Sequence, residues 1–318
     1  MKIAFRLLLT WVSFAGATCL LNAQTSEVTH NTWTSGAPMP VAVKFPMAGV
    51  LGGSIYVVGG VTDSAVVANT QIYNPVANTW STGPAIPTTT MDAAVAVVKN
   101  VLYVFGGSND GTTQTNAVWG YSAKTKTWTA KASMPTTRAS AAAAVYKNVI
   151  YVIGGYSISG GRLDTVESYN PATNTWTEEA PLPVGKSEPS VGVVGTTIVA
   201  TGGYSASGDN GNNESYNIST NSWTSLAAEP TGTNASCTGS AKGALYVAGG
   251  SNSSGNAVNN TQSFSPKKNK WTVHTTIPQA VADPGSAVYK GVLYCLGGGN
   301  VSVQFQGTVY DFVQIYQP

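Results

Sequence analysis

Ionisable side chains are scarce in this sequence. Of its 318 residues, 9% are Asp, Glu, Lys or Arg, and 2 are histidines, His30 and His274. Transition-metal sites usually combine several imidazole or thiolate ligands, so we expect none here. The acidic residues nowhere alternate as densely as in an EF-hand calcium loop. GxSxG, phosphate-loop and CxxC motifs are also missing, so the sequence predicts no metal and no cofactor.

Long apolar runs are missing too, apart from one at the N-terminus. Two basic residues precede the apolar run 7–21, and Ala23 offers a small residue for cleavage. The run is shorter than the roughly 20 residues that cross a bilayer, which favours a signal peptide over a membrane anchor. We therefore expect a signal peptide at 1–23 and a mature chain at 24–318. That chain would be secreted or periplasmic, with no membrane span after cleavage.

The mature chain has no excess of either charge and few cysteines. Residues 1–23 contain 2 of the 16 basic residues and none of the 14 acidic ones, so 14 of each remain. Phosphate binding needs a clustered basic excess, so we expect no nucleic-acid partner. The mature cysteines are Cys237 and Cys295, and the sequence leaves open whether they pair. Two buried free thiols are the simpler interpretation, although an exported protein can form a disulfide.

Glycine is abundant, and it marks a repeat. The sequence has 35 glycines, and an aliphatic run ends in Gly-Gly six times, at intervals of 47 or 48 residues. The first glycines of these pairs are Gly59, Gly106, Gly154, Gly202, Gly249 and Gly297. An aromatic residue follows in five repeats, with a tryptophan seven positions later. These pairs are Tyr73 and Trp80, Tyr121 and Trp128, Tyr169 and Trp176, Tyr216 and Trp223, and Phe264 and Trp271.

This pattern resembles the kelch repeat family, whose diglycine, tyrosine and tryptophan stand here in segments such as IYVVGG and QIYNPVANTW. The resemblance covers residues 30 to 318 and implies an all-β fold, a six-bladed β-propeller with four antiparallel strands in each blade. In the second repeat we expect strands at 93–98, 101–107, 117–122 and 128–131. Trp119 replaces the Gln or Glu that other repeats carry two positions before the aromatic residue, so we expect it to be a surface aromatic.

The sixth repeat has no tryptophan of its own. An unpaired Trp33 lies near the N-terminus in a segment that matches the outermost strand of other repeats. We therefore expect the N-terminal strand to complete the last blade and close the ring, which removes exposed sheet edges and favours a monomer. The aromatic residue that pairs with Trp33 is either Tyr316 or Tyr310, and the spacing leaves both open.

Counting back from each diglycine aligns the starts of the six innermost strands. Fourteen residues before the diglycines stand Phe45, Asp92, Ser140, Glu188, Ala235 and Asp283. Sixteen residues before them stand Val43, Thr90, Arg138, Lys186, Thr233 and Val281. The connections between the second and third strands vary in length and share one face, which is where function usually resides. In kelch proteins, similar positions commonly line a pocket at the channel mouth. The candidate ligand-binding residues are therefore Phe45, Asp92, Arg138, Lys186, Glu188 and Asp283.

The resemblance is specific for fold and says little about function. We expect an exported module for protein or carbohydrate binding that takes its ligand on the face of the variable loops. The alternative is a sugar epimerase or mutarotase of the sialic acid type, since exported six-bladed kelch proteins of that kind exist. Such an enzyme needs a general acid and base, for which Glu188, Arg138 and Lys186 are the catalytic candidates. The sequence favours binding over catalysis.

Overall fold

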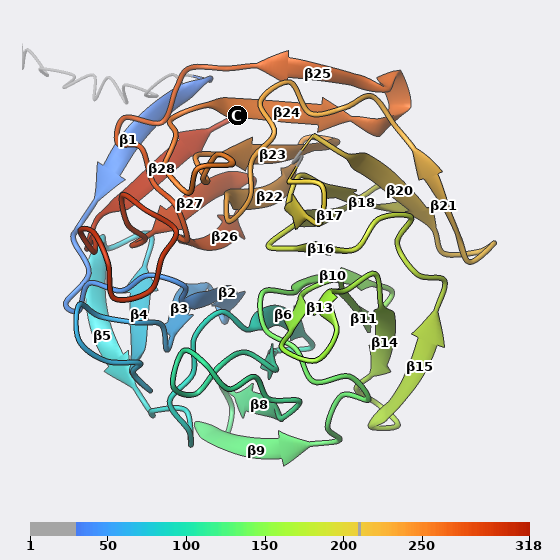
Figure 1. Cartoon of the computed structure of the whole chain (residues 1–318). Helices are drawn as coiled ribbons and strands as arrows, with labels where there is room; N and C mark the ends of the chain where they lie inside the picture. Colours follow the sequence, from blue (N-terminus) through green and yellow to red (C-terminus); the bar gives the residue numbers. More distant parts are fainter. Residues whose placement is uncertain (1–29, 209–210) are drawn as a thin grey trace, which may run out of the picture.

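Six four-stranded antiparallel sheets surround a central axis in the computed structural model (Figure 1). The structure describes residues 30–208 and 211–318, so the expected signal peptide at 1–23 lies outside the described residues. No helix in the described part of the chain is long and apolar enough to cross a membrane. The expected all-β six-bladed propeller is confirmed.

Each blade runs from an inner strand at the channel to an outer strand at the rim (Figure 1). Blades one and two consist of β2 (Met47–Leu51), β3 (Ser54–Val58), β4 (Thr70–Asn74), β5 (Thr79–Gly83), β6 (Ala94–Val98), β7 (Val101–Phe105), β8 (Val118–Ser122) and β9 (Thr127–Lys131). Blades three and four consist of β10 (Ala142–Tyr146), β11 (Val149–Ile153), β14 (Val166–Asn170), β15 (Thr175–Glu179), β17 (Ser190–Val194), β18 (Thr197–Thr201), β20 (Asn213–Asn217) and β21 (Ser222–Ser225). Blades five and six consist of β22 (Cys237–Ala241), β23 (Ala244–Ala248), β24 (Thr261–Ser265), β25 (Lys270–Val273), β26 (Gly285–Tyr289), β27 (Val292–Leu296), β28 (Val313–Gln317) and β1 (Thr32–Gly36). Short ladders pair β12 (Tyr156–Ser157) with β13 (Gly161–Arg162) and β16 (Lys186–Ser187) with β19 (Tyr204–Ser205), and Pro266–Lys268 form a 3-10 turn, η1.

The second strand of each blade is apolar at nearly every position because both of its faces are buried. In β7, Leu102 packs in one cluster with Val58 of blade one. Tyr103 and Phe105 pack in another cluster with Ile150 of blade three. Alternating side chains of a strand point to opposite faces, so one strand supplies core to two blade junctions. Burying each large aliphatic side chain contributes roughly 1.5–3 kcal/mol.

The repeated tyrosine and tryptophan join neighbouring blades. The Tyr73 and Trp80 rings lie 4.9 Å apart, and the Trp80 indole N–H donates to the carbonyl of Ala37, outside its own blade. Equivalent indole bonds follow around the ring, for example from Trp128 to Pro84. Trp119 differs from expectation, because it is half-buried like Trp128 and packs in the same cluster. Part of its surface therefore packs at the junction between blades one and two.

The N-terminal strand closes the ring as expected. Strand β1 pairs antiparallel with β28 over five residues, with Trp33 opposite Tyr316. Their ring centroids are 4.9 Å apart, the same separation as in the first blade. The Trp33 indole donates to the Thr275 carbonyl, which follows strand β25 of blade five. Tyr316 is therefore the aromatic residue of the sixth repeat, and Tyr310 lies in the preceding loop.

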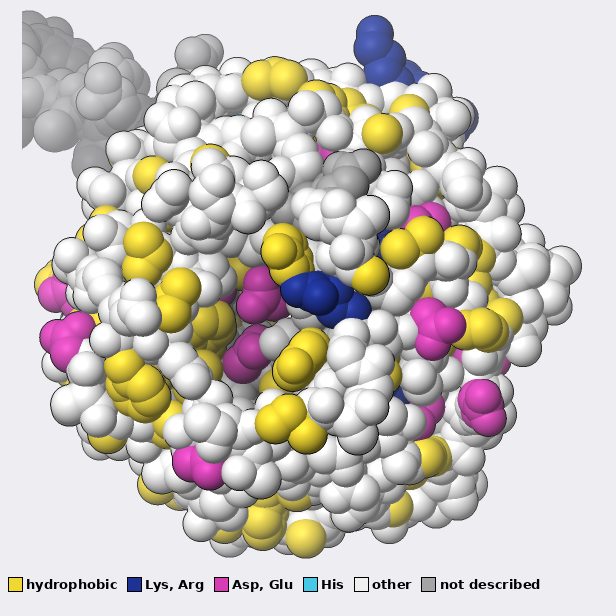
Figure 2. All heavy atoms as spheres, in the orientation of Figure 1, with side chains coloured by type: hydrophobic (Ala, Val, Ile, Leu, Met, Phe, Trp, Pro, Cys, Tyr) yellow, Lys and Arg dark blue, Asp and Glu magenta, His cyan; other side chains and the backbone are white. Residues whose placement is uncertain are grey.

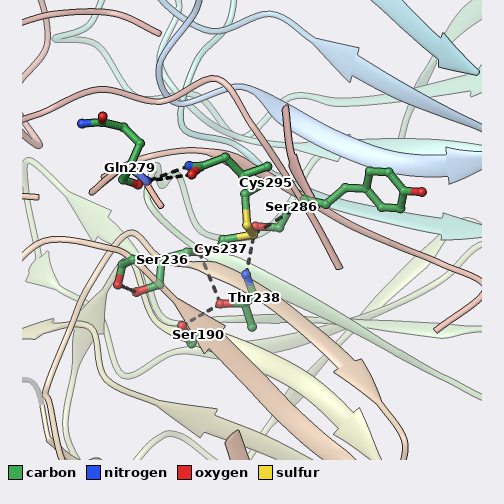
Figure 3. The surroundings of a disulfide bond; sticks show 10 residues. Ser190, Ser236, Cys237, Thr238, Gln279, Ser286 and Cys295 are labelled. Atoms are coloured by element: carbon green, nitrogen blue, oxygen red, sulfur yellow. Dashed lines mark hydrogen bonds between the residues drawn. A yellow bond between two sulfur atoms is a disulfide. The ribbon is translucent and has the colours of Figure 1, made fainter. Parts of the chain in front are cut away.

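A disulfide links the fifth and sixth blades. Cys237 of β22 is bonded to Cys295 of β27, and both residues are fully buried (Figure 3). The simpler interpretation of two free thiols is therefore wrong. Beside the disulfide, the hydroxyls of Ser190 and Thr238 lie 2.7 Å apart, and the Thr238 N–H donates to the Ser286 hydroxyl at 3.0 Å. These bonds tie the inner strands of blades four, five and six together beside the channel.

Candidate functional site

A closed ring of backbone hydrogen bonds surrounds the channel mouth. Each residue 14 positions before a diglycine donates its N–H to the carbonyl of its counterpart on the preceding blade. The six bonds are Asp92 to Phe45 (3.0 Å), Ser140 to Asp92 (2.8 Å), Glu188 to Ser140 (2.7 Å), Ala235 to Glu188 (3.2 Å), Asp283 to Ala235 (2.9 Å) and Phe45 to Asp283 (2.9 Å). We call these six residues the mouth ring. The ring brings the starts of all six inner strands together around one opening.

Every member of the mouth ring has a left-handed backbone. Their φ angles lie between 52° and 56°, although none of them is glycine. Such conformations cost on the order of 1–2 kcal/mol each and cluster at functional sites. Here the hydrogen bonds of the ring hold all six in place. The strained positions coincide with the residues that the repeat alignment selects as site candidates.

The diglycines hold the ring segments in position. In blade one, Gly59 and Gly60 have φ angles of +61° and +98°, and the Gly60 N–H donates to the Thr90 carbonyl at 2.8 Å. A Cβ on Gly59 would lie 2.2 Å from that carbonyl oxygen, so a side chain cannot fit there. Thr90 stands two residues before Asp92. Each diglycine thus fixes the approach of the next blade to the mouth ring.

An inner cavity of about 230 Å3 lies at the mouth ring and beside the inner strands. All six ring residues line it, together with small side chains of the inner strands such as Ala94, Ala142 and Ser286. The structure thus brings Phe45, Asp92, Glu188 and Asp283 to one opening. Figure 2 shows acidic side chains inside the central hollow of this face and a basic side chain at its margin.

Asp92 and Glu188 both have raised pKa values, so each keeps its proton to a higher pH than an exposed acid does. Burial raises the pKa of Asp92 to about 7, and a hydrogen bond from the Ser140 hydroxyl partly offsets this rise. Burial raises the pKa of Glu188 to about 8, and the negative charge of Asp92 adds to the rise. The guanidinium of Arg162 acts in the opposite direction on Glu188. Both side chains are half-buried, so desolvation and mutual repulsion act together at the channel mouth.

Asp283 is the most enclosed of the three acids, with 4% of its surface exposed. Burial raises its pKa well above the usual value, and the charges of Glu188 and Asp92 raise it further. The Ser302 hydroxyl donates to Oδ1 at 2.8 Å, whereas Oδ2 is buried without a hydrogen-bond partner among the described residues. Lys44 lowers this pKa through its charge, but its ammonium donates to the backbone carbonyls of Val303 and Gln306.

An outer cavity of about 340 Å3 opens above the ring and is lined mainly by the variable loops of blades three to six. Its lining residues are Ser140, Tyr156, Arg162, Ser187, Glu188, Tyr204, Asn234, Ser251, Asn252, Ser253, Gly255 and Ser302. The Arg162 guanidinium lies over the Tyr204 ring, 4.1 Å from its centroid. Because Ser140 and Glu188 line both cavities, we call the two together the loop-face funnel. Its outer part offers many hydroxyl and amide groups and one cation.

Arg138 and Lys186 do not line either cavity. Both are buried, at 0% and 1% exposure, and each pairs with a glutamate of its own blade. Arg138 donates to Glu167 and to the carbonyl of Gly154, and Lys186 donates to Glu214 at 2.7 Å. The expectation that they stand beside Glu188 at the opening is corrected, because these cations brace the interior of blades three and four.

Sequence reasoning missed Arg162, Tyr156 and Tyr204 as funnel residues. All three lie in the short ladders of the variable loops, and Tyr156 and Tyr204 each stand two residues after the first glycine of their diglycine. The sequence did contain a clue to these residues. The loop segments 156–164 and 204–212 carry aromatic or basic residues close to the diglycine. No group of three His, Cys, Asp or Glu among residues 30–208 and 211–318 is arranged to hold a metal ion. The funnel is suited to hydrogen bonding and proton transfer by carboxyl groups.

Raised carboxyl pKa values predict a stability that falls with pH. The unfolded chain releases these protons near pH 4, whereas the folded protein keeps them to about pH 7 at Asp92 and about 8 at Glu188. The free energy of unfolding is therefore expected to decrease across this interval and to level off above it. Urea unfolding over this range measures the slope. The slope should be smaller in the double variant Asp92→Asn/Glu188→Gln than in the parent. It should stay unchanged in Glu178→Gln, which alters an exposed glutamate. An equal slope in the parent and both variants would contradict the raised pKa values.

Comparison with known proteins agrees with this geometry. The model described as KLHDC2/KLHL20/DRC7 Kelch-repeats domain matches residues 81–226, and the Kelch motif matches residues 48–86 and 234–273. The chain belongs to the kelch-repeat family. No curated protein matches it in sequence. A solved structure titled "Structure of YjhT" is similar to this kelch protein with a TM-score of 0.73 and 19% identity, covering 88% of this chain and 96% of that one. At this identity the likeness supports the fold alone.

Proposed function

We propose that this kelch protein is an exported binding module that captures a projecting group of a protein or glycan in its loop-face funnel. The observation that carries the proposal is the funnel itself, in which a ring of strained backbone forms the floor and polar loop residues form the walls. Variable loops on a rigid frame are the usual location of recognition residues. A concave site with convergent polar groups fits a small ligand group better than a flat surface does.

Export is part of the proposal, and two observations support it. The first 23 residues have the charge and apolar pattern of a signal peptide. The buried Cys237–Cys295 disulfide is typical of proteins that fold in an oxidising compartment. A reducing cytosol does not favour such a disulfide between two blades.

The test is binding to a panel of defined glycans and peptides, followed by substitutions in the funnel. Arg162→Ala and Glu188→Gln should each weaken a panel ligand by about 10- to 100-fold, or roughly 1–3 kcal/mol, because each removes a charged or hydrogen-bonding group from the site. The control is Lys267→Ala/Lys268→Ala in the exposed turn η1. If the lysine variant loses binding while both funnel variants retain it, recognition takes place on the opposite face.

A second candidate is a sugar epimerase or mutarotase, and the raised pKa of Glu188 favours it. A carboxyl group with a pKa of about 8 beside the Arg162 guanidinium can donate or accept a proton near neutral pH. Anomer exchange of reducing sugars, followed by NMR, tests this role. An enzyme should accelerate exchange well above buffer, and Glu188→Gln should remove the acceleration. No acceleration across the panel rules the activity out for those sugars.

A further inference from the structure

The inner part of the funnel carries three acids and no matching base. Asp92, Glu188 and Asp283 line the inner cavity, and none of its other described lining residues is ionisable. The nearest cations act from outside it. Arg162 lines only the outer cavity, and the buried Lys44 gives hydrogen bonds to two backbone carbonyls. The inner cavity therefore favours a ligand with positive charge.

A second observation points to a missing hydrogen-bond donor. Asp283 is more than nine-tenths buried and lines the inner cavity, and its Oδ2 has no hydrogen-bond partner in the described chain. Buried polar atoms are nearly always hydrogen-bonded, and leaving one without a donor costs free energy. Because Asp283 is one of the residues that line the inner cavity, a ligand bound there would lie next to this side chain. A donor brought by the ligand would satisfy it.

The arrangement of the acids suggests which cation fits. Asp92, Glu188 and Asp283 belong to blades two, four and six, so they alternate with Phe45, Ser140 and Ala235 around the mouth ring. Three acceptors spaced around one axis match the three N–H donors of a primary ammonium group. The described acids are not grouped closely enough to coordinate a metal ion. An ammonium nitrogen lies about 2.7–3.2 Å from the oxygens to which it donates, a longer distance than the roughly 2.0–2.6 Å that Mg²⁺ and Ca²⁺ need.

We propose that the mouth ring binds a primary alkylammonium group, which Asp92, Glu188 and Asp283 receive as hydrogen-bond acceptors. This inference rests on the proposed binding role of the loop-face funnel and names the chemistry that its floor recognises. The ammonium comes from a lysine side chain of a protein or from an amine-bearing sugar. Its carbon chain lies in the outer cavity, where the exposed Tyr156 offers apolar surface.

Binding should be coupled to proton release. The free acids hold protons near neutral pH, and an ammonium group stabilises their ionised forms. Affinity is therefore expected to rise with pH between about 6 and 8.5, while the amine itself stays protonated. Arg162 and Lys44 are the basic groups whose charges act on these acids, and burial lowers the pKa of Lys44.

The experiment titrates the full mature chain with n-butylammonium by NMR and calorimetry, with 1-butanol as the neutral analogue of the same size. The expected dissociation constant is in the millimolar range, because the probe has few atoms. Asp283→Asn should weaken binding by about tenfold or more, and Asp92→Asn serves the same purpose if the first variant does not fold. Glu178→Gln should bind as the parent does. Calorimetry in two buffers of different ionisation enthalpy should show protons released on binding.

Two further ligands separate the sources of the amine. Nα-acetyl-lysine methylamide represents a protein partner, and a sugar with its amine on C6 represents a glycan, so the tighter of the two identifies the source. The inference is overturned if n-butylammonium binds no better than 1-butanol, or if Asp283→Asn and Asp92→Asn leave its affinity unchanged. A panel ligand without an amine that still depends on Arg162 would then leave the proposed function standing. If n-butylammonium does not bind and no panel ligand depends on Arg162, both the ammonium site and the proposed binding function are wrong.

Discussion

Deletion of residues 24–38 is expected to lower the free energy of unfolding by several kcal/mol. The deletion removes strand β1 and with it five paired positions along β28. It also removes Trp33, whose ring packs on Tyr316 and whose indole N–H bonds to Thr275. Losing a packed strand and a half-buried aromatic residue leaves an open sheet edge and an unfilled junction. Urea unfolding followed by tryptophan fluorescence measures the change.

A shorter deletion that ends at residue 29 is the control, because it leaves β1 intact. The long deletion should also increase self-association, since unpaired edges of β28 are free to pair with another chain. Size-exclusion chromatography detects this. If the long deletion unfolds at the same urea concentration as the control and stays monomeric, the closing strand contributes little to the fold.

Glu167→Ala is expected to destabilise the protein by about 3–5 kcal/mol, because it leaves the Arg138 guanidinium buried without its partner. Arg138 is fully buried, and within the described part of the chain its other bonds reach only the carbonyls of Gly154 and Thr165. The double variant Arg138→Met/Glu167→Leu should recover most of the loss, since it removes both charges and keeps the volume.

Thermal and urea unfolding of the single and double variants form a double-mutant cycle. The exposed Glu178→Gln again provides the control, because it changes a glutamate on the strand that pairs with β14. A single variant as stable as the parent would mean that Arg138 reaches water or another acceptor. Ligand binding should be unchanged in the double variant, because Arg138 lies outside the funnel.

The repeat pattern predicted the blades because all six blades of a propeller pack against their neighbours through equivalent residues. The diglycine, tyrosine and tryptophan each meet the same neighbour in every blade, so their spacing was sufficient to give the strand order and the closing role of Trp33. Counting also selected the mouth ring. It could not show that the six residues share one hydrogen-bonded circle, because that circle depends on left-handed φ angles at residues such as Phe45 and Glu188.

Counting failed for Arg138 and Lys186 because it gives a level in the blade and not the direction of a side chain. The backbone at this level faces the preceding diglycine, as the bond from Gly107 to the Arg138 carbonyl shows, and the side chain turns into its own blade. A clue was present in the sequence. The two blades that carry these cations also carry Glu167 and Glu214 two positions before their tyrosine, where the other blades have Gln or Trp.

The disulfide could not be derived from the repeat either. Cys237 lies in the inner strand of blade five and Cys295 in the second strand of blade six, so their contact depends on how two blades pack rather than on a shared position in the repeat. The contact between Arg162 and Tyr204 in the funnel wall was out of reach for a similar reason. Arg162 and Tyr204 come from loops of different lengths, and only the folded arrangement places the guanidinium over the ring.

The mouth ring is held together by main-chain hydrogen bonds, so its shape does not depend on which side chains it carries. Phe, Asp, Ser, Glu and Ala all occupy equivalent places in it, so the circle accepts side chains of any polarity without changing its bonds. Each blade can therefore change the character of the opening by a single substitution, while the other five keep the opening in place. A protein of this design can acquire a new ligand in small steps, since altering what the floor presents does not require rebuilding the floor.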